Sequence, residues 1–207
     1  VYFGEGSIIK SITPAIFPNY TDEFWVYTTD FEKAKQLLRQ AGYPNGFDLT
    51  LSYDSSIAEM AEAAVLIKGS FDQVGIRTTL DPLPAAVYSE KKARRELMCQ
   101  LDNFHWPWIA DTGYTAWVYL ANPDTNILDS VYFNNPEFNK LVTDMISTPY
   151  GPERDKMDRR VQQIAAEEVP WIFLINPGWR EAFRKGWTNF HWYPDNNVHF
   201  DWLYRRD

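Results

Sequence analysis

The stretch over residues 47–80 changes its periodicity twice, and few folds accommodate such a pattern. Apolar and polar side chains alternate from Phe47 to Tyr53, which is typical of a half-buried strand. A helical pattern follows that carries Ala64, Ile67, Phe71 and Val74, and Gly75 to Leu80 again favours a strand. Because this connection is long enough for a right-handed crossover, the pattern predicts a β-α-β unit with two parallel strands.

Capping motifs predict where two helices begin. Glu32 follows Thr29 by three residues, and Glu59 follows Ser56 by three, so each pair forms a capping box. The first box precedes an apolar helical face that Gly42 ends, consisting of Phe31, Ala34, Leu37, Leu38 and Ala41. A helix is therefore expected on each side of the first predicted strand.

The rest of the chain continues as alternating helices and strands, which predicts an α/β fold. Residues 4–27 show neither period and are expected to be extended and irregular. Downstream we expect a helix over 85–93, a strand over 97–103, an aromatic loop over 104–119, helices over 136–146 and 152–167, a buried strand over 169–175 and a strand-like end over 198–203. The sequence contains no internal repeat and no linker.

Composition excludes several classes of protein. The 207 residues, 45% of them apolar, suit one domain or one lobe with part of another. The net charge of −8 argues against nucleic-acid binding, which needs a basic surface. The single cysteine, Cys99, provides neither an internal disulfide framework nor a thiolate cluster for zinc. No run approaches the roughly 18 to 20 apolar residues that cross a bilayer, and the missing initiator methionine suggests a chain cut from something larger.

The block from Thr29 to Phe47, TDFEKAKQLLRQAGYPNGF, resembles the helix, turn and strand signature of family 5 extracellular solute-binding proteins. These are the dipeptide and oligopeptide receptors of ABC importers. Three further features agree with the resemblance: Gly75 and Ile76 before a strand, a Trp-x-x-Asp element from Trp108 to Asp111, and Glu168-Val169-Pro170 before an apolar stretch. The resemblance extends over nearly the whole chain.

Members of that family are similar in having a two-lobed clamshell, the type II periplasmic-binding-protein fold, at about twice this length. The resemblance therefore implies a mixed sheet flanked by helices. It also implies that residues 1–176 form most of the second, ligand-binding lobe. Residues 177–207 would form a tail returning to the first lobe, which is otherwise absent.

Asp111 is the first candidate for ligand contact. In peptide-binding relatives the aspartate of the Trp-x-x-Asp element pairs with the free ammonium of the ligand, and the resemblance implies this role for Asp111. A carboxylate in a closed, water-poor site gains from such a pairing because the local dielectric is low. The alternative is that Asp111 caps a helix beginning at Thr112 or Gly113.

Aromatic residues cluster around the same position. Trp106 and Trp108, flanked by His105 and Tyr114, could stack on peptide side chains, on sugar faces or over a ligand cation. The alternative is that they pack beneath the loop as a separate apolar cluster. The sequence departs from peptide receptors because Thr112 and Gly113 follow the aspartate, and because His105 stands where some oligopeptide receptors have an arginine. An oligosaccharide ligand is therefore an alternative.

No pattern for catalysis or for a metal or other cofactor is found in the sequence. The three histidines, His105, His191 and His199, are scattered, and combining the last two with Asp201 gives no recognised ligand spacing. Gly-x-Ser-x-Gly, Gly-x-Gly-x-x-Gly and Walker motifs are absent. We expect a periplasmic or extracellular receptor, not an enzyme, that binds a peptide or oligosaccharide between closing lobes and delivers it to an importer permease. A protein-interaction module whose aromatic loop docks a partner is the alternative outside transport.

Overall fold

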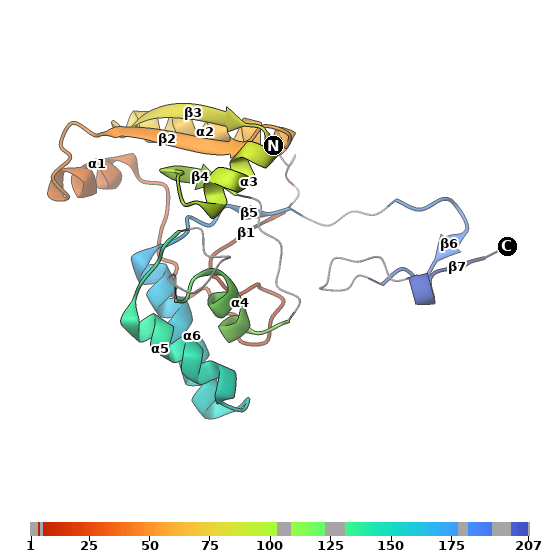
Figure 1. The fold of residues 1–207 in the computed structure, drawn as a ribbon. Helices are drawn as coiled ribbons and strands as arrows, with labels where there is room; N and C mark the ends of the chain where they lie inside the picture. The colour runs from red at the N-terminus through yellow and green to blue at the C-terminus, as the bar shows by residue number, and fades with distance from the viewer. Residues whose placement is uncertain are drawn as a thin grey trace. The chain divides into compact units, whose positions relative to one another are not determined.

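The computed structural model describes residues 4, 6–102, 109–122, 131–177, 182–191 and 200–206. These residues form two compact units (Figure 1). The first unit contains the described residues 26–102, and the second contains the described residues 4–25 together with those from 109 onward. Helices and strands alternate up to residue 101, and three consecutive helices and short strands follow, so the predicted α/β class is confirmed.

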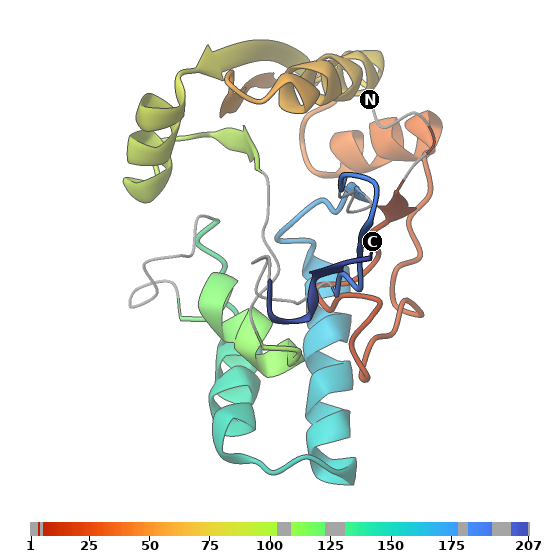
Figure 2. The ribbon, with the colours of Figure 1, turned by 90° about the vertical axis from the view of Figure 1, so that its right-hand side faces the viewer.

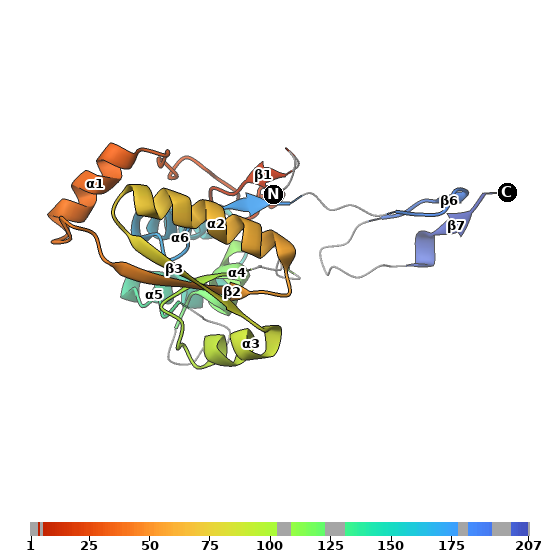
Figure 3. The ribbon, with the colours of Figure 1, turned by 90° about the horizontal axis from the view of Figure 1, so that it is seen from above.

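The first unit is built on the predicted β-α-β motif. Strands β2 (Asp48–Asp54) and β3 (Arg77–Leu83) pair in parallel through helix α2 (Ala58–Gln73). Strand β4 (Cys99–Leu101) joins the other edge of β2, also in parallel, which gives the order β3-β2-β4. Helix α3 (Ala85–Ala93) connects β3 to β4, and α2 and α3 lie on opposite faces of the sheet (Figure 3). Its buried core consists of Leu51, Tyr53, Met60, Ala64 and Leu101.

Both predicted capping boxes are wrong, because the N-cap of each helix lies one residue after the predicted one. Helix α1 (Phe31–Gln40) is capped by Asp30, whose carboxylate accepts a hydrogen bond from the Lys33 amide. Ile57 precedes α2 and provides no side-chain cap. The amide and hydroxyl of Ser56 instead donate to the Asp54 carboxylate, because an aspartate at the end of a strand can bond the backbone two residues later.

The second unit has a core of three helices, α4 (Thr112–Tyr119), α5 (Pro136–Ser147) and α6 (Pro152–Glu168). The helices α5 and α6 run side by side (Figure 2), and each begins with proline, where the missing amide hydrogen costs no helical bond. The side chains that fill the core include Phe138, Val142, Met145, Val161 and Ile164, none more than 2% exposed. Each such burial contributes about 1.5 to 3 kcal/mol.

Two short antiparallel pairs complete the second unit. Strand β1 (Ser7–Ile8) pairs with β5 (Ile175–Asn176), and β6 (Trp187–Thr188) pairs with β7 (Tyr204–Arg205). The buried strand expected over 169–175 is wrong, since Val169 is left-handed at φ 46°, Pro170 has no amide hydrogen and Ile172 is exposed. In the tail, Phe200–Trp202 is a 3-10 helix where part of a strand was expected; Val198 and His199 lie outside the described residues.

The segment over 4–25 contributes more than the sequence suggested. It is irregular as predicted, apart from β1, but it is not a peripheral extension. Ile12 and Phe17 are buried, and the Gln162 side chain of α6 bonds the Ser11 hydroxyl, the Thr21 amide and the Asn19 carbonyl. A buried amide that is fully hydrogen-bonded fixes the path of the backbone around it.

Candidate functional site

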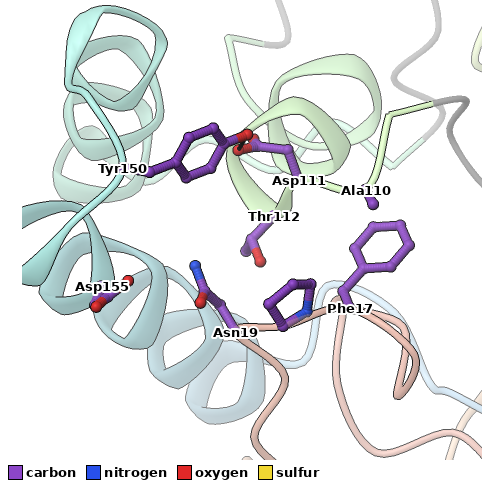
Figure 4. A pocket seen from close by; sticks show the side chains of 8 residues that line it. Phe17, Asn19, Ala110, Asp111, Thr112, Tyr150 and Asp155 are labelled. Atoms are coloured by element: carbon purple, nitrogen blue, oxygen red, sulfur yellow. Dashed lines mark hydrogen bonds between the residues drawn. The ribbon is translucent and has the colours of Figure 1, made fainter.

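A pocket of about 230 Å³ lies in the second unit (Figure 4). Three separate stretches of chain form its wall, represented by Phe17, Pro18, Asn19, Ala110, Asp111, Thr112, Tyr150 and Asp155. Sites that enclose a whole small ligand have volumes of about 300 to 1,000 Å³. The pocket is therefore large enough for one end or one side chain of a peptide-sized ligand.

Asp111 is placed at the pocket wall by the beginning of α4. Its backbone is extended, at φ −142° and ψ 127°, and its Oδ1 accepts a hydrogen bond of 2.6 Å from the Tyr114 amide. This is the geometry of an N-cap, which satisfies one of the free amides of a first helical turn. The alternative that Asp111 caps a helix beginning at Thr112 is confirmed, and contact with a ligand stays a prediction.

Arg154 of α6 forms a buried ion pair with Asp111. Its Nη2 lies 2.9 Å from Oδ1 and 2.8 Å from Oδ2 of the carboxylate. The two side chains are only 6% and 8% exposed. Charge-assisted bonds between buried partners are strong, and breaking such a pair leaves a costly unpaired charge. Asp111 is therefore held rigidly, with its charge balanced by Arg154.

Tyr150 completes the surroundings of this carboxylate. It lies in the connection between α5 and α6, and its hydroxyl donates a 2.9 Å hydrogen bond to Oδ2 of Asp111 (Figure 4). This hydrogen bond, partial burial and the charge of Asp111 together raise the pKa of the Tyr150 phenol. The Arg154 guanidinium lies 5.6 Å from the centre of the Tyr150 ring, a cation–π distance.

A second carboxylate, Asp158, shares Arg154 with Asp111. It is 1% exposed, and burial raises its pKa to about 6 in spite of a hydrogen bond from Asn19 and the nearby guanidinium. Its Oδ1 is 3.9 Å from Nε of Arg154, and neither atom has a hydrogen-bond partner among the described residues. The site thus contains a carboxylate that changes its charge near pH 6.

A larger pocket, of about 320 Å³, lies in the first unit between α1 and the end of α2. Its wall includes Lys35, Arg39, Tyr43 and Asp72, and none of the ionisable residues that line it is buried. Recognition of a charged group is stronger where water is excluded. We therefore take the pocket beside Asp111, where buried charges meet the wall, as the candidate site.

The structure locates two of the five predicted site residues. Asp111 lines the pocket, whereas Tyr114 does not; the Tyr114 ring lies 6.2 Å from that of Trp117 on the same helix. His105, Trp106 and Trp108 lie outside the described residues. The aromatic loop expected over 104–119 is wrong from Thr112 onward, because α4 begins there and packs Ala116 and Val118 into the core.

Several residues around the site were not predicted. Arg154, Asp158 and Gln162 recur at spacings of four in a helix that was predicted, so the sequence places them on one helical face. That spacing was the only available signal, because three polar residues on a helix usually face water. Tyr150 and the stretch from Phe17 to Asn19 carried no recognisable motif.

The described ranges contain neither a candidate metal site nor a candidate membrane span. No group of three or more His, Cys, Asp or Glu side chains there is arranged to hold a metal ion. In the same ranges, every helix is too short or too polar to cross a bilayer. Of the combination of His191, His199 and Asp201, His199 lies outside the described residues.

The sequence matches that of named binding proteins from bacteria. It is 31% identical over 179 residues to heme-binding protein A of Haemophilus influenzae, covering 83% of this chain and 32% of that protein. It is 26% identical over 198 residues to the glutathione-binding protein GsiB of Escherichia coli, covering 92% of this chain and 38% of that protein. The chain thus spans about a third of the length of these relatives.

Solved structures give the same fold. The periplasmic binding protein AgaA of A. tumefaciens, in complex with agropinic acid, superposes with a TM-score of 0.78 at 29% identity, covering 91% of this chain and 39% of that one. The oligopeptide-binding protein AppA of Bacillus subtilis, in complex with a nonapeptide, gives a TM-score of 0.82 at 17% identity, covering 99% and 44%. The expected type II periplasmic-binding-protein fold, of which this chain is a part, is confirmed.

The family itself is established by a sequence profile. The profile described as bacterial extracellular solute-binding proteins, family 5, middle part, matches residues 1–126, which is more than half of the chain. This match includes the block from Thr29 to Phe47 that carried the resemblance. The chain belongs to family 5 of the bacterial extracellular solute-binding proteins.

Proposed function

We propose that the full-length protein is the solute-binding receptor of an ABC importer, which binds a peptide or peptide-sized solute between two lobes and delivers it to a permease. The observation that carries the proposal is the pocket beside Asp111, where a rigid buried carboxylate meets a cavity large enough for one end of such a ligand. Family membership supports the transport role. The protein is proposed to catalyse no reaction.

The residues of the pocket support a peptide as the first ligand class. Asp111 would receive a hydrogen-bond donor or a cation of the ligand, and Phe17 and Tyr150 would supply apolar contact beside it. His105, Trp106, Trp108 and Tyr114 remain proposed contacts from the resemblance. A relative in the same family, GsiB, is named a glutathione-binding protein.

A different solute is the second candidate. AgaA, at 29% identity, was solved with agropinic acid. Thr112 and Gly113, which follow Asp111, depart from the pattern of peptide receptors and also favour a ligand other than a peptide. An oligosaccharide remains one such alternative. We further propose that the receptor works in the periplasm or outside the cell, at the membrane through its importer, and that residues 1–176 and 177–207 divide as the resemblance implies.

Calorimetric titration of the full-length protein tests the proposal. The panel contains the peptide STSA, its N-acetylated form, glutathione, agropinic acid and an oligosaccharide. We expect at least one member to bind. Asp111→Asn should weaken that binding by at least about 30-fold, because the donor group of the ligand would lose the buried carboxylate as its partner. Asparagine still caps a helix, so α4 should remain intact.

Asp30→Asn is the matched control. Asp30 also caps a helix through a bond to the third amide, but it lies in the other unit and does not line the pocket. Its substitution should leave the dissociation constant unchanged. The proposal is wrong if the wild-type protein binds no member of the panel, if it turns one over, or if Asp111→Asn and Asp30→Asn bind equally well.

A further inference from the structure

The Asp111 carboxylate has no free hydrogen-bonding position in this structure. A carboxylate offers about four lone-pair sites. Oδ1 accepts from the Tyr114 amide and from Nη2 of Arg154, and Oδ2 accepts from the same Nη2 and from the Tyr150 hydroxyl. A ligand that binds Asp111 must therefore displace one of these three partners.

The three partners differ in how easily they can leave. The Tyr114 amide belongs to the first turn of α4, so its loss would open the helix. Arg154 is buried, and its departure would leave an unpaired charge inside the protein. Tyr150 is 73% exposed, lines the pocket and belongs to a connection between helices. Its hydroxyl can return to water at little cost.

We propose that the Tyr150 hydroxyl occupies the position of the ligand on Asp111, and that a donor group of the ligand displaces it on binding. This inference rests on the proposed function and deepens it. Tyr150 thereby lowers the affinity of the receptor, because each binding event breaks a hydrogen bond of the unliganded protein.

The charges around the pocket identify the donor as a cationic group. Among the described residues, Asp111, Asp155 and Asp158 lie close enough to interact electrostatically, and Arg154 is the cation that acts on Asp158 beside them. Negative charge therefore exceeds positive charge in the group of four residues. A ligand ammonium that replaces a neutral hydroxyl on Oδ2 reduces this imbalance, whereas an anionic group would increase it.

Removing one oxygen atom tests the displacement. Tyr150→Phe keeps the ring beside Arg154 and removes the hydroxyl, so the ligand no longer competes with an internal bond. We expect the dissociation constant for the peptide STSA, or for the panel member that binds, to fall about 2- to 10-fold. Tyr43→Phe, at an exposed tyrosine of the first unit, should leave it unchanged.

A spectroscopic measurement gives an independent readout. The ¹³Cζ resonance of Tyr150, assigned by its loss in Tyr150→Phe, is sensitive to the hydrogen bond from the phenol to Asp111. At about pH 7, where a ligand ammonium keeps its charge, displacement by the ligand should shift that resonance. The N-acetylated peptide should bind more weakly than the free peptide, since it lacks the ammonium.

The outcomes separate this inference from the proposed function. If the wild-type protein binds a ligand but Tyr150→Phe binds it no more tightly, or if the ligand leaves the ¹³Cζ resonance of Tyr150 unshifted at about pH 7, the displacement is wrong and the receptor function stands. Equal binding of the free and the N-acetylated peptide would show that the donor group of the ligand is not cationic. If no probe binds, the proposed function fails and this inference fails with it.

Discussion

At the scale of single residues, the second unit places two carboxylates beside one guanidinium. Arg154 bonds both oxygens of Asp111, and only its Nε is directed near Asp158, at 3.9 Å. Arginine can satisfy several acceptors, but here Nη2 bonds Asp111, Nη1 bonds the Thr148 carbonyl, and no described hydrogen bond joins Arg154 to Asp158. Asp158 is consequently the weak partner, and burial raises its pKa to about 6.

This pKa makes the stability of the protein depend on pH. The pKa of Asp158 in the folded state lies above its unfolded value, so the folded state binds the proton more tightly. The contribution of Asp158 is therefore most favourable below about pH 4 and is lost as the pH rises through 6. Two pKa units correspond to up to about 3 kcal/mol. The free energy of unfolding, measured in urea between pH 4 and 7, should therefore fall with pH in the wild type. Asp158→Asn should lack the part of this fall that comes from Asp158. Equal pH profiles of the variant and the wild type would contradict the assignment.

The glycine after the cap of α4 has a steric role. A Cβ added at Gly113 would lie 2.7 Å from Nη2 of Arg154 and 3.1 Å from Oδ1 of Asp111. Gly113→Ala should therefore displace the buried ion pair and lower the free energy of unfolding by about 1 to 3 kcal/mol. Gly69→Ala, in α2 with nothing within 4 Å, should instead raise it by up to about 1 kcal/mol. Thermal unfolding of both variants provides the comparison, and similar effects would show that Gly113 has no special role.

At the scale of elements, the sequence predicted those whose pattern is local. The β-α-β unit, α3, α5 and α6 follow from periodicity, because each buries one face of a regular helix or strand. The helix α4 was only an alternative to the predicted loop, because its residues do not form an amphipathic pattern and five of the eight are buried. Tertiary packing decided its conformation, together with the cap at Asp111.

The candidate site was predicted only in part, for the same physical reason. Asp111 was found through a motif, but its partners come from distant positions in the sequence: Arg154 is separated from it by 43 residues and Tyr150 by 39. Neither partner carries a local signal, since a charged residue on a helix and a tyrosine in a turn are usually exposed. Only the packing of three helices brings them together.

The attachment of the irregular segment to α6 leads to another prediction. Gln162 accepts from the Ser11 hydroxyl and the Thr21 amide and donates to the Asn19 carbonyl, while 3% exposed. Gln162→Ala should lower the free energy of unfolding by about 2 to 4 kcal/mol, because buried groups lose their partners. The adjacent Gln163, which bonds Glu167 on the same helix, is the control, and Gln163→Ala should cost less than about 0.5 kcal/mol. Equal losses in chemical denaturation would contradict the role of Gln162.

At the scale of the whole molecule, the proposal of a two-lobed receptor predicts closure on ligand binding. The radius of gyration of the full-length protein, measured by small-angle X-ray scattering, should decrease when a bound panel member saturates it. Asp111→Asn should show no decrease at the same ligand concentration. A radius that stays constant in a saturated wild-type protein would indicate binding without closure.

Helix α1 packs less closely against the molecule than the other long helices of the described residues do. It has ten residues and buries none of them, and even Leu37 is 51% exposed. A helix this short is marginal in water without packing, so its end caps and the salt bridge between Lys35 and Glu32 provide most of its local support. Local melting of α1 therefore exposes little new apolar surface and need not disturb the core. In hydrogen–deuterium exchange, the amides of α1 should accept deuterium far sooner than those of α6, and a protease should cut α1 before the other helices of the described residues.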